Sequence, residues 1–134
     1  MFSNVLARVL SALLKHMHSY IVSPHVEDLP TVKSDCYALG HIPNIIGAID
    51  GTHVTLVPRR RSEQVYRNRK SYHSMNVQML CLADQYISNV NVKFPGSVRD
   101  AYILRNSSIP YVMWQLQRHR VWLLVEDMDP IQYE

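Results

Sequence analysis

The sequence lacks the features that mark disulfide-rich, zinc-binding or membrane-spanning proteins. Only two of its 134 residues are cysteines, Cys36 and Cys81, and they lie far apart without metal-type spacing. We therefore expect reduced thiols in an intracellular compartment. The apolar stretch Val5–Leu14 is interrupted by Arg8, has no clear cleavage site and is too short to span a bilayer. Nothing among the seven histidines resembles a zinc site.

The composition is that of a globular domain with a mild positive charge. Hydrophobic residues make up 47% of the chain and charged residues 19%, which is enough apolar surface for a core and excludes a disordered tail. The length is that of one domain. A formal net charge of +3 permits a nucleic-acid partner but does not demand one.

Hydrophobic spacing predicts a helix followed by a mixed sheet. Pro24 and Pro30 are expected to break the chain into a loop after the first helix. Three consecutive strands favour antiparallel pairing, and the later helix allows a crossover to a parallel neighbour. The resulting β-β-β-α-β order with an N-terminal helix is an α/β arrangement typical of the opening half of a ribonuclease-H-like fold. The expected elements are a helix over 3–21, strands over 45–57, 73–83 and 86–94, a helix over 97–106 and a strand over 119–125.

Asp50 is the carboxylate in the most unusual setting. It closes the apolar run Ile-Ile-Gly-Ala-Ile, which predicts a strand buried on both faces. An acid in a buried strand is costly to desolvate unless it is paired, and a divalent cation is a partner that would give that pairing a function. The alternative is a carboxylate satisfied by backbone N–H groups of the Gly51-Thr52 turn.

A basic segment follows this strand. It places six positive charges within twelve residues, offset only by Glu63, with Tyr66 and Tyr72 interspersed. One interpretation is contact with the phosphate backbone of DNA, and the alternative is an ordinary solvated loop. The six residues are Arg59, Arg60, Arg61, Arg67, Arg69 and Lys70.

Three blocks carry a family resemblance. "IPNIIGAIDGTHV", "YRNRKSYHSMNVQMLCLAD" and "FPGSVRDAYILRNSSI" occur in this order, and together they resemble PIF/Harbinger-type DDE transposases and the nucleases derived from them. The resemblance implies a ribonuclease-H-like core that binds Mg²⁺ or Mn²⁺ through three acids and cuts DNA phosphodiesters. Residues 1–40 would then be an N-terminal helix and linker, and residues 41–134 a partial DDE endonuclease domain.

The resemblance assigns the acids unequally. Asp50 matches the first acid of the triad. The second should follow the last predicted strand, where Glu126 and Asp127 compete by one residue, and a solvated acidic tail is the alternative for both. The third, a glutamate on a later helix, should lie beyond Glu134, so the domain is expected to be truncated.

Asp100 is a further candidate acid near the metal. It follows Pro-Gly-Ser as an acid does in the family, with Arg99 where the family often has histidine. Alternatively, the spacing from Ser97 is that of a capping box, in which Asp100 would serve the start of a helix. The predicted catalytic set is thus Asp50, Asp100 and Asp127, with Glu126 as an additional metal ligand.

The function implied by the resemblance is metal-dependent endonuclease activity on DNA. The alternative is a catalytically inactive remnant that binds DNA or protein. Expected partners are DNA and a Myb-like accessory protein, with no membrane, in the nucleus and with the cytoplasm as a second location. An incompletely covered sheet would also leave an apolar face open, which predicts self-association.

Overall fold

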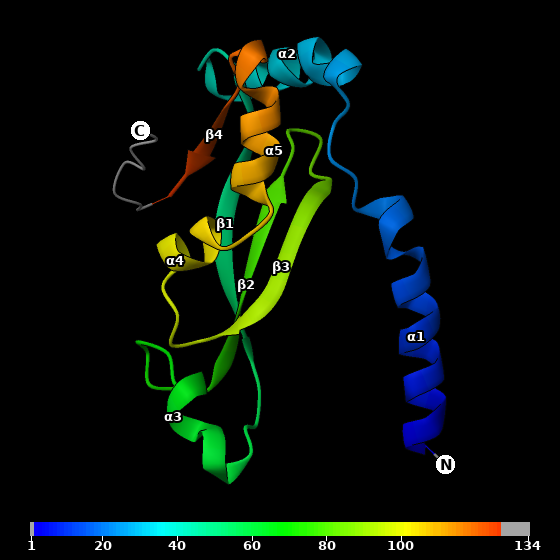
Figure 1. Ribbon diagram of the computed structural model, residues 1–134, viewed down its shortest axis with the longest axis vertical. Coiled ribbons are helices and arrows are strands. Elements are labelled where there is room, and N and C mark those ends of the chain that lie inside the picture. The colour runs from blue at the N-terminus through cyan, green and yellow to red at the C-terminus, as the bar shows by residue number, and fades with distance from the viewer. Residues whose placement is uncertain (1, 127–134) are drawn as a thin grey trace.

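A four-stranded mixed sheet forms the centre of the molecule (Figure 1). The computed structural model describes residues 2–126. The strands are β1 (Ile45–Thr55), β2 (Ser74–Cys81), β3 (Ile87–Pro95) and β4 (Trp122–Val125), in the spatial order β3-β2-β1-β4. β2 runs antiparallel to both β1 and β3, and β4 runs parallel to β1. The predicted fold, a partial ribonuclease-H-like mixed sheet with an N-terminal helix, is confirmed.

Two helices, rather than the one predicted, connect β3 to β4. They are α4 (Asp100–Arg105) and α5 (Ile109–Leu116). Pro110 lies in the first turn of α5, where its missing N–H costs no hydrogen bond, so a new helix can begin there. A helix start at Ser97 was predicted and is wrong. The N-cap residue of α4 is Arg99, because residues 95–98 form a turn before it.

The predicted loop between the first helix and β1 contains a second helix. α1 (Phe2–Tyr20) is followed by the short 3₁₀ turn Val26–Asp28 and by α2 (Leu29–Gly40). Pro30 does not break the chain, since it lies in the first turn of α2. Leu29 is only 2% exposed and packs against Ile46, so α2 contributes to the core of the sheet.

The core lies between one face of the sheet and the α4–α5 pair. Two clusters of buried apolar side chains fill it. They are Leu29, Ile46, Leu116 and Val121, and Ile49, Leu80, Leu104 and Ile109. Because the second cluster joins β1 and β2 to α4 and α5, it fixes where α4 begins, immediately beside β1.

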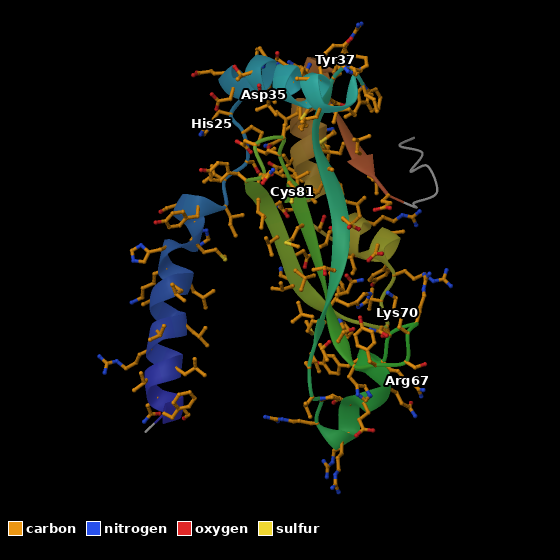
Figure 2. The ribbon with its side chains drawn as sticks, turned by 180° about the vertical axis from the view of Figure 1, so that it is seen from behind. His25, Asp35, Tyr37, Arg67, Lys70 and Cys81 are labelled. Atoms are coloured by element: carbon orange, nitrogen blue, oxygen red, sulfur yellow. The ribbon has the colours of Figure 1, made fainter. Side chains whose placement is uncertain are left out.

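The opposite face of the sheet is open in the part of the chain that the structure describes. Figure 2 views the molecule from this side, with α1 beside the sheet. Val54 is 53% exposed and Leu124 is 45% exposed. The expectation that β1 is buried on both faces is therefore wrong, since its burial alternates from Ala48 to Asp50. No residue of α1 is buried, and none of the described helices is long and apolar enough to cross a membrane.

The segment that connects β1 to β2 forms a basic end of the molecule. The chain there forms the 3₁₀ turn Arg60–Ser62, the short helix α3 (Glu63–Tyr66) and a loop that leads into β2. All six basic residues predicted to contact DNA are exposed on this segment.

Candidate active site

Asp50 lies in the middle of β1 and is exposed to solvent. Its Oδ1 accepts a hydrogen bond from the backbone N–H of Gly51 at 2.7 Å. The prediction that Asp50 lies in a strand buried on both faces is therefore wrong, because one face of β1 is open beyond Ile49. The bond from Gly51 agrees with the alternative in which backbone N–H groups satisfy the carboxylate, although Gly51 lies in the strand and not in a turn. The interpretation of Asp50 as a metal ligand stays a prediction, since an exposed carboxylate is equally free to bind a cation or water.

The pairing of β1 with β4 brings Glu126 beside Asp50. The strands are parallel, with Ala48 paired to Leu124 and Ile49 paired to Val125. The next residue along each chain is Asp50 on β1 and Glu126 just after β4. Both are exposed, and neighbouring strands lie about 4.8 Å apart. Of the two competing acids after β4, Glu126 is thus the one whose backbone lies next to Asp50; Asp127 is outside the described residues.

Asp100 lies on the other face of the sheet from Asp50. A Cβ added to Gly51 would come within 2.6 Å of Asp100 Oδ1, so Asp100 lies directly over Gly51. Ile49 also faces the helices, in contact with the cluster of Leu104. Successive side chains of a strand point to opposite faces, so Asp50 points away from Asp100. The structure does not bring the two acids together on one face, and the role of Asp100 as a ligand stays a prediction.

Asp100 is instead held by a polar side chain from β2. Asn76 Nδ2 donates to Asp100 Oδ1 at 2.6 Å and to the carbonyl of Val98 at 3.2 Å. Ser97 lies outside the helix, so the capping box given as the alternative for Asp100 is wrong, but Asp100 does lie in the first turn of α4, as that alternative expected. The physical reason is that the turn after β3 uses up residues 95–98 before the helix begins.

The inward face of β2 is polar where it passes under α4. Ser74, Asn76 and Gln78 are each at most 1% exposed. Among the described residues, Asn76 Oδ1 and both amide atoms of Gln78 are buried without a hydrogen-bond partner. Such orphaned groups are rare in folded proteins and point to a ligand or water. In the sequence of β2, these polar residues alternate with Met75, Val77 and Met79. This alternation is visible from the sequence, but burial of the polar residues was not predicted.

The loop that carries Arg69 and Lys70 is ordered by one side chain. Asn68 is 7% exposed, and its Oδ1 accepts the backbone N–H groups of Lys70 at 2.9 Å and Tyr72 at 3.3 Å. Figure 2 shows Arg67 and Lys70 on this loop, at the α3 end of the sheet. The basic loop therefore has a defined shape rather than being an unstructured run of charges.

No group of three metal-ligating side chains occurs within residues 2–126. Asp50 and Glu126 are two carboxylates at neighbouring positions of β1 and β4 on one face, and Asp100 is turned to the other. The described residues therefore fit part of the predicted triad and not the whole of it.

Comparison with known proteins identifies the family. Residues 49–124 match the DDE superfamily endonuclease family. The chain belongs to this family. The matched region begins within β1, one residue before Asp50, and runs through β2 and β3 to Leu124 of β4.

The relatives that the chain matches include proteins named as nucleases. The chain is similar to the nuclease HARBI1 of Bos taurus, with 31% identity over 123 residues, which are 91% of this chain and 35% of that protein. HARBI1 of Homo sapiens is 29% identical over the same shares, and ALP1-like of Arabidopsis thaliana is 32% identical over 59% of this chain and 20% of that protein. The chain thus spans about a third of the length of the HARBI1 relatives. No solved structure matches it.

Proposed function

We propose that this domain cleaves phosphodiester bonds of DNA with the help of a divalent cation, using Asp50 and Glu126 as the acids that hold it. The observation that carries the proposal is the β1–β4 register, in which Ile49 pairs with Val125 and the next residue of each chain is an acid. The DDE endonuclease family, to which the chain belongs, generally uses divalent metals.

The oxygen donors suit Mg²⁺ or Mn²⁺. Mg²⁺ is usually bound by one or two carboxylates, with waters and substrate phosphates completing its coordination. Asp50 and Glu126 supply two such carboxylates on exposed positions. When bound, the cation would lower the pKa of an attached water and offset the negative charge on the phosphate.

The chain's own residues would orient these acids and hold the DNA. The Gly51 N–H that bonds Asp50 Oδ1 restricts one carboxylate oxygen and leaves the other free. Arg59, Arg60 and Arg61 present positive charge on the segment that follows β1. Such charges bind phosphates without reading base sequence, so the proposal covers affinity for DNA and not sequence specificity.

A plasmid-nicking assay tests the proposal. We expect nicking by the purified chain with Mn²⁺ or Mg²⁺, abolition by EDTA, and a loss of at least about tenfold in Asp50→Asn and Glu126→Gln, because each change removes a ligand charge. Glu27→Gln is the matched control, an exposed acid in the turn before α2, and should nick like the wild type. Equal nicking by wild type and Asp50→Asn would remove Asp50 from the reaction.

A second function is favoured by one observation. All six basic residues of the segment between β1 and β2 are exposed, which suits a domain that binds DNA without cutting it. In that case, DNA would bind with strong salt dependence while no nicking occurs under any of the metal conditions.

A further inference from the structure

A polar cavity of about 160 Å³ lies on the α4 side of the sheet, away from Asp50. Its walls come from the Asn68–Lys70 loop and from the turn that joins β3 to α4. Figure 1 shows these two segments side by side below α4. His53 of β1 and Asn76 of β2 also line the cavity. Residues far apart in the sequence therefore build one concave site.

The charge around this cavity favours an anion. Arg69 and Lys70 line it from one side and Arg99 from the other, against a single acid, Asp100. One oxygen of that acid is already occupied by the amide of Asn76 at 2.6 Å. Three cations against one carboxylate leave a net positive field.

A polar network fixes the position of His53. Asn68 Nδ2 donates to Ser74 Oγ at 2.9 Å, and Ser74 Oγ lies 2.9 Å from His53 Nδ1. Ser74 Oγ can accept the amide proton and also donate its own, and in the Nε2–H tautomer of His53 it donates to Nδ1. The other ring nitrogen, Nε2, then carries the proton and can donate to a ligand. Ser74 is fully buried, so this network is a permanent part of the fold.

The size of the cavity restricts what it can take. Sites for drug-sized ligands measure about 300–1,000 Å³, and this cavity is smaller, with room for several waters at about 10–15 Å³ each. It suits one phosphate group rather than a whole nucleoside.

We propose that this cavity binds one backbone phosphate of DNA, with Arg69, Lys70 and Arg99 supplying the charge and His53 Nε2 a hydrogen bond. This rests on the proposed function and adds to it a defined phosphate site on the α4 side of the sheet. Arg99 is the residue that best tests the site. It lies outside the basic segment, between β3 and α4, and lines the same cavity as Arg69 and Lys70.

Salt-dependent binding of a short DNA duplex tests this site. Each phosphate contact contributes about 0.9 to the slope of log affinity against log salt. We expect joint replacement of Arg69, Lys70 and Arg99 by Gln to lower that slope by about 0.9, because the three cations share one phosphate, and Arg99→Gln alone to weaken binding. Arg105→Gln, an exposed arginine later in α4 and outside the cavity, should leave both the slope and the affinity unchanged. A triple variant that still binds DNA with an unchanged slope overturns the site and leaves the proposed function standing.

Titration with inorganic phosphate separates the site from its DNA. In the wild type we expect saturable shifts of the Asn68 and Asn76 side-chain amide signals in NMR spectra, and loss of that saturation in Arg99→Gln. If inorganic phosphate saturates the site but DNA does not bind, the anion site is supported. The proposal that its phosphate comes from DNA is then overturned, together with the proposed function. Absence of saturation in a wild-type protein that shows a folded spectrum overturns the anion site itself.

Discussion

Gly51 and Asp100 lie so close that a Cβ on the glycine would come within 2.6 Å of the aspartate Oδ1. The same Cβ would lie 3.1 Å from Asn76 Oδ1. A side chain at position 51 is therefore incompatible with the hydrogen bond that holds Asp100 to Asn76. The absence of a side chain at Gly51 therefore leaves the space that Asp100 of α4 occupies above β1.

Gly51→Ala should destabilise the protein by about 1 to 3 kcal/mol, the cost of displacing a charged group from its buried hydrogen-bond partner. Urea unfolding measures this loss. Gly40→Ala is the matched control, because a Cβ there meets nothing within 4 Å and should be neutral or slightly stabilising. Equal stability of the Gly51→Ala variant and the wild type would contradict the close approach of Asp100.

Leu29→Ala should cost about 2 to 5 kcal/mol of unfolding free energy, because it leaves a cavity in the core cluster around Ile46. Leu39→Ala, in the same helix, is the control, since Leu39 is 74% exposed and its loss should matter by less than about 0.5 kcal/mol. Urea unfolding of the two variants checks this. Similar small losses in both would mean that α2 is not part of the folded core.

The basic segment should carry much of the salt dependence of DNA binding. Replacing Arg59, Arg60 and Arg61 by Gln should lower the slope of log affinity against log salt by up to about 2.7, at about 0.9 for each contact. Fluorescence anisotropy with labelled duplex measures it. Replacing Arg8 and Lys15 of α1 by Gln is the control for general loss of charge, and a slope lowered equally by charge lost there would contradict a localised interface.

Cys36 offers a test of pH dependence. Burial raises the pKa of its thiol, the charges of Asp35 and Asp84 raise it further, and a backbone hydrogen bond at Ala83 opposes them in part. The folded protein therefore favours the neutral thiol. This contribution to stability is fully present below the thiol's unfolded pKa and is lost as the pH rises through the raised folded value.

The corresponding measurement is the pH midpoint of alkylation by iodoacetamide in a Cys81→Ala background, where Cys36 is the single thiol. We expect a higher midpoint in the folded protein than in urea. A midpoint that is the same in both states would argue against the packing of α2 beside the Ala83–Asp84 turn.

The sheet could be predicted because its signals are local. Alternating residues define β2 and β3, which are joined at Asp84-Gln85 by a hairpin turn without glycine. Gln85 adopts the left-handed conformation with φ 69°, and Asp84 Oδ1 accepts the Tyr86 N–H at 3.0 Å. The turn thus replaces glycine with a side-chain hydrogen bond.

The elements that were missed depend on tertiary contacts. Pro30 suggested a break, yet it lies in the first turn of α2, which packs Leu29 against the sheet. Which face of β1 carries Asp50 depends on where α4 and α5 lie, and spacing alone does not determine that. The position of Glu126 next to Asp50 likewise follows from the β1–β4 register and not from spacing, while Asp127 lies outside the described residues.

The solvent exposure of Asp50 has a consequence for how the free protein behaves. A carboxylate that is hydrated by water pays no desolvation cost, so no cation is needed to offset such a cost. Strand β1 should therefore keep its shape with or without a divalent cation in the medium. Chelators should leave the melting temperature of the DNA-free chain unchanged. Folding and cofactor loading would then be thermodynamically uncoupled, with the cation recruited only when nucleic acid brings its own oxygens to complete the coordination sphere.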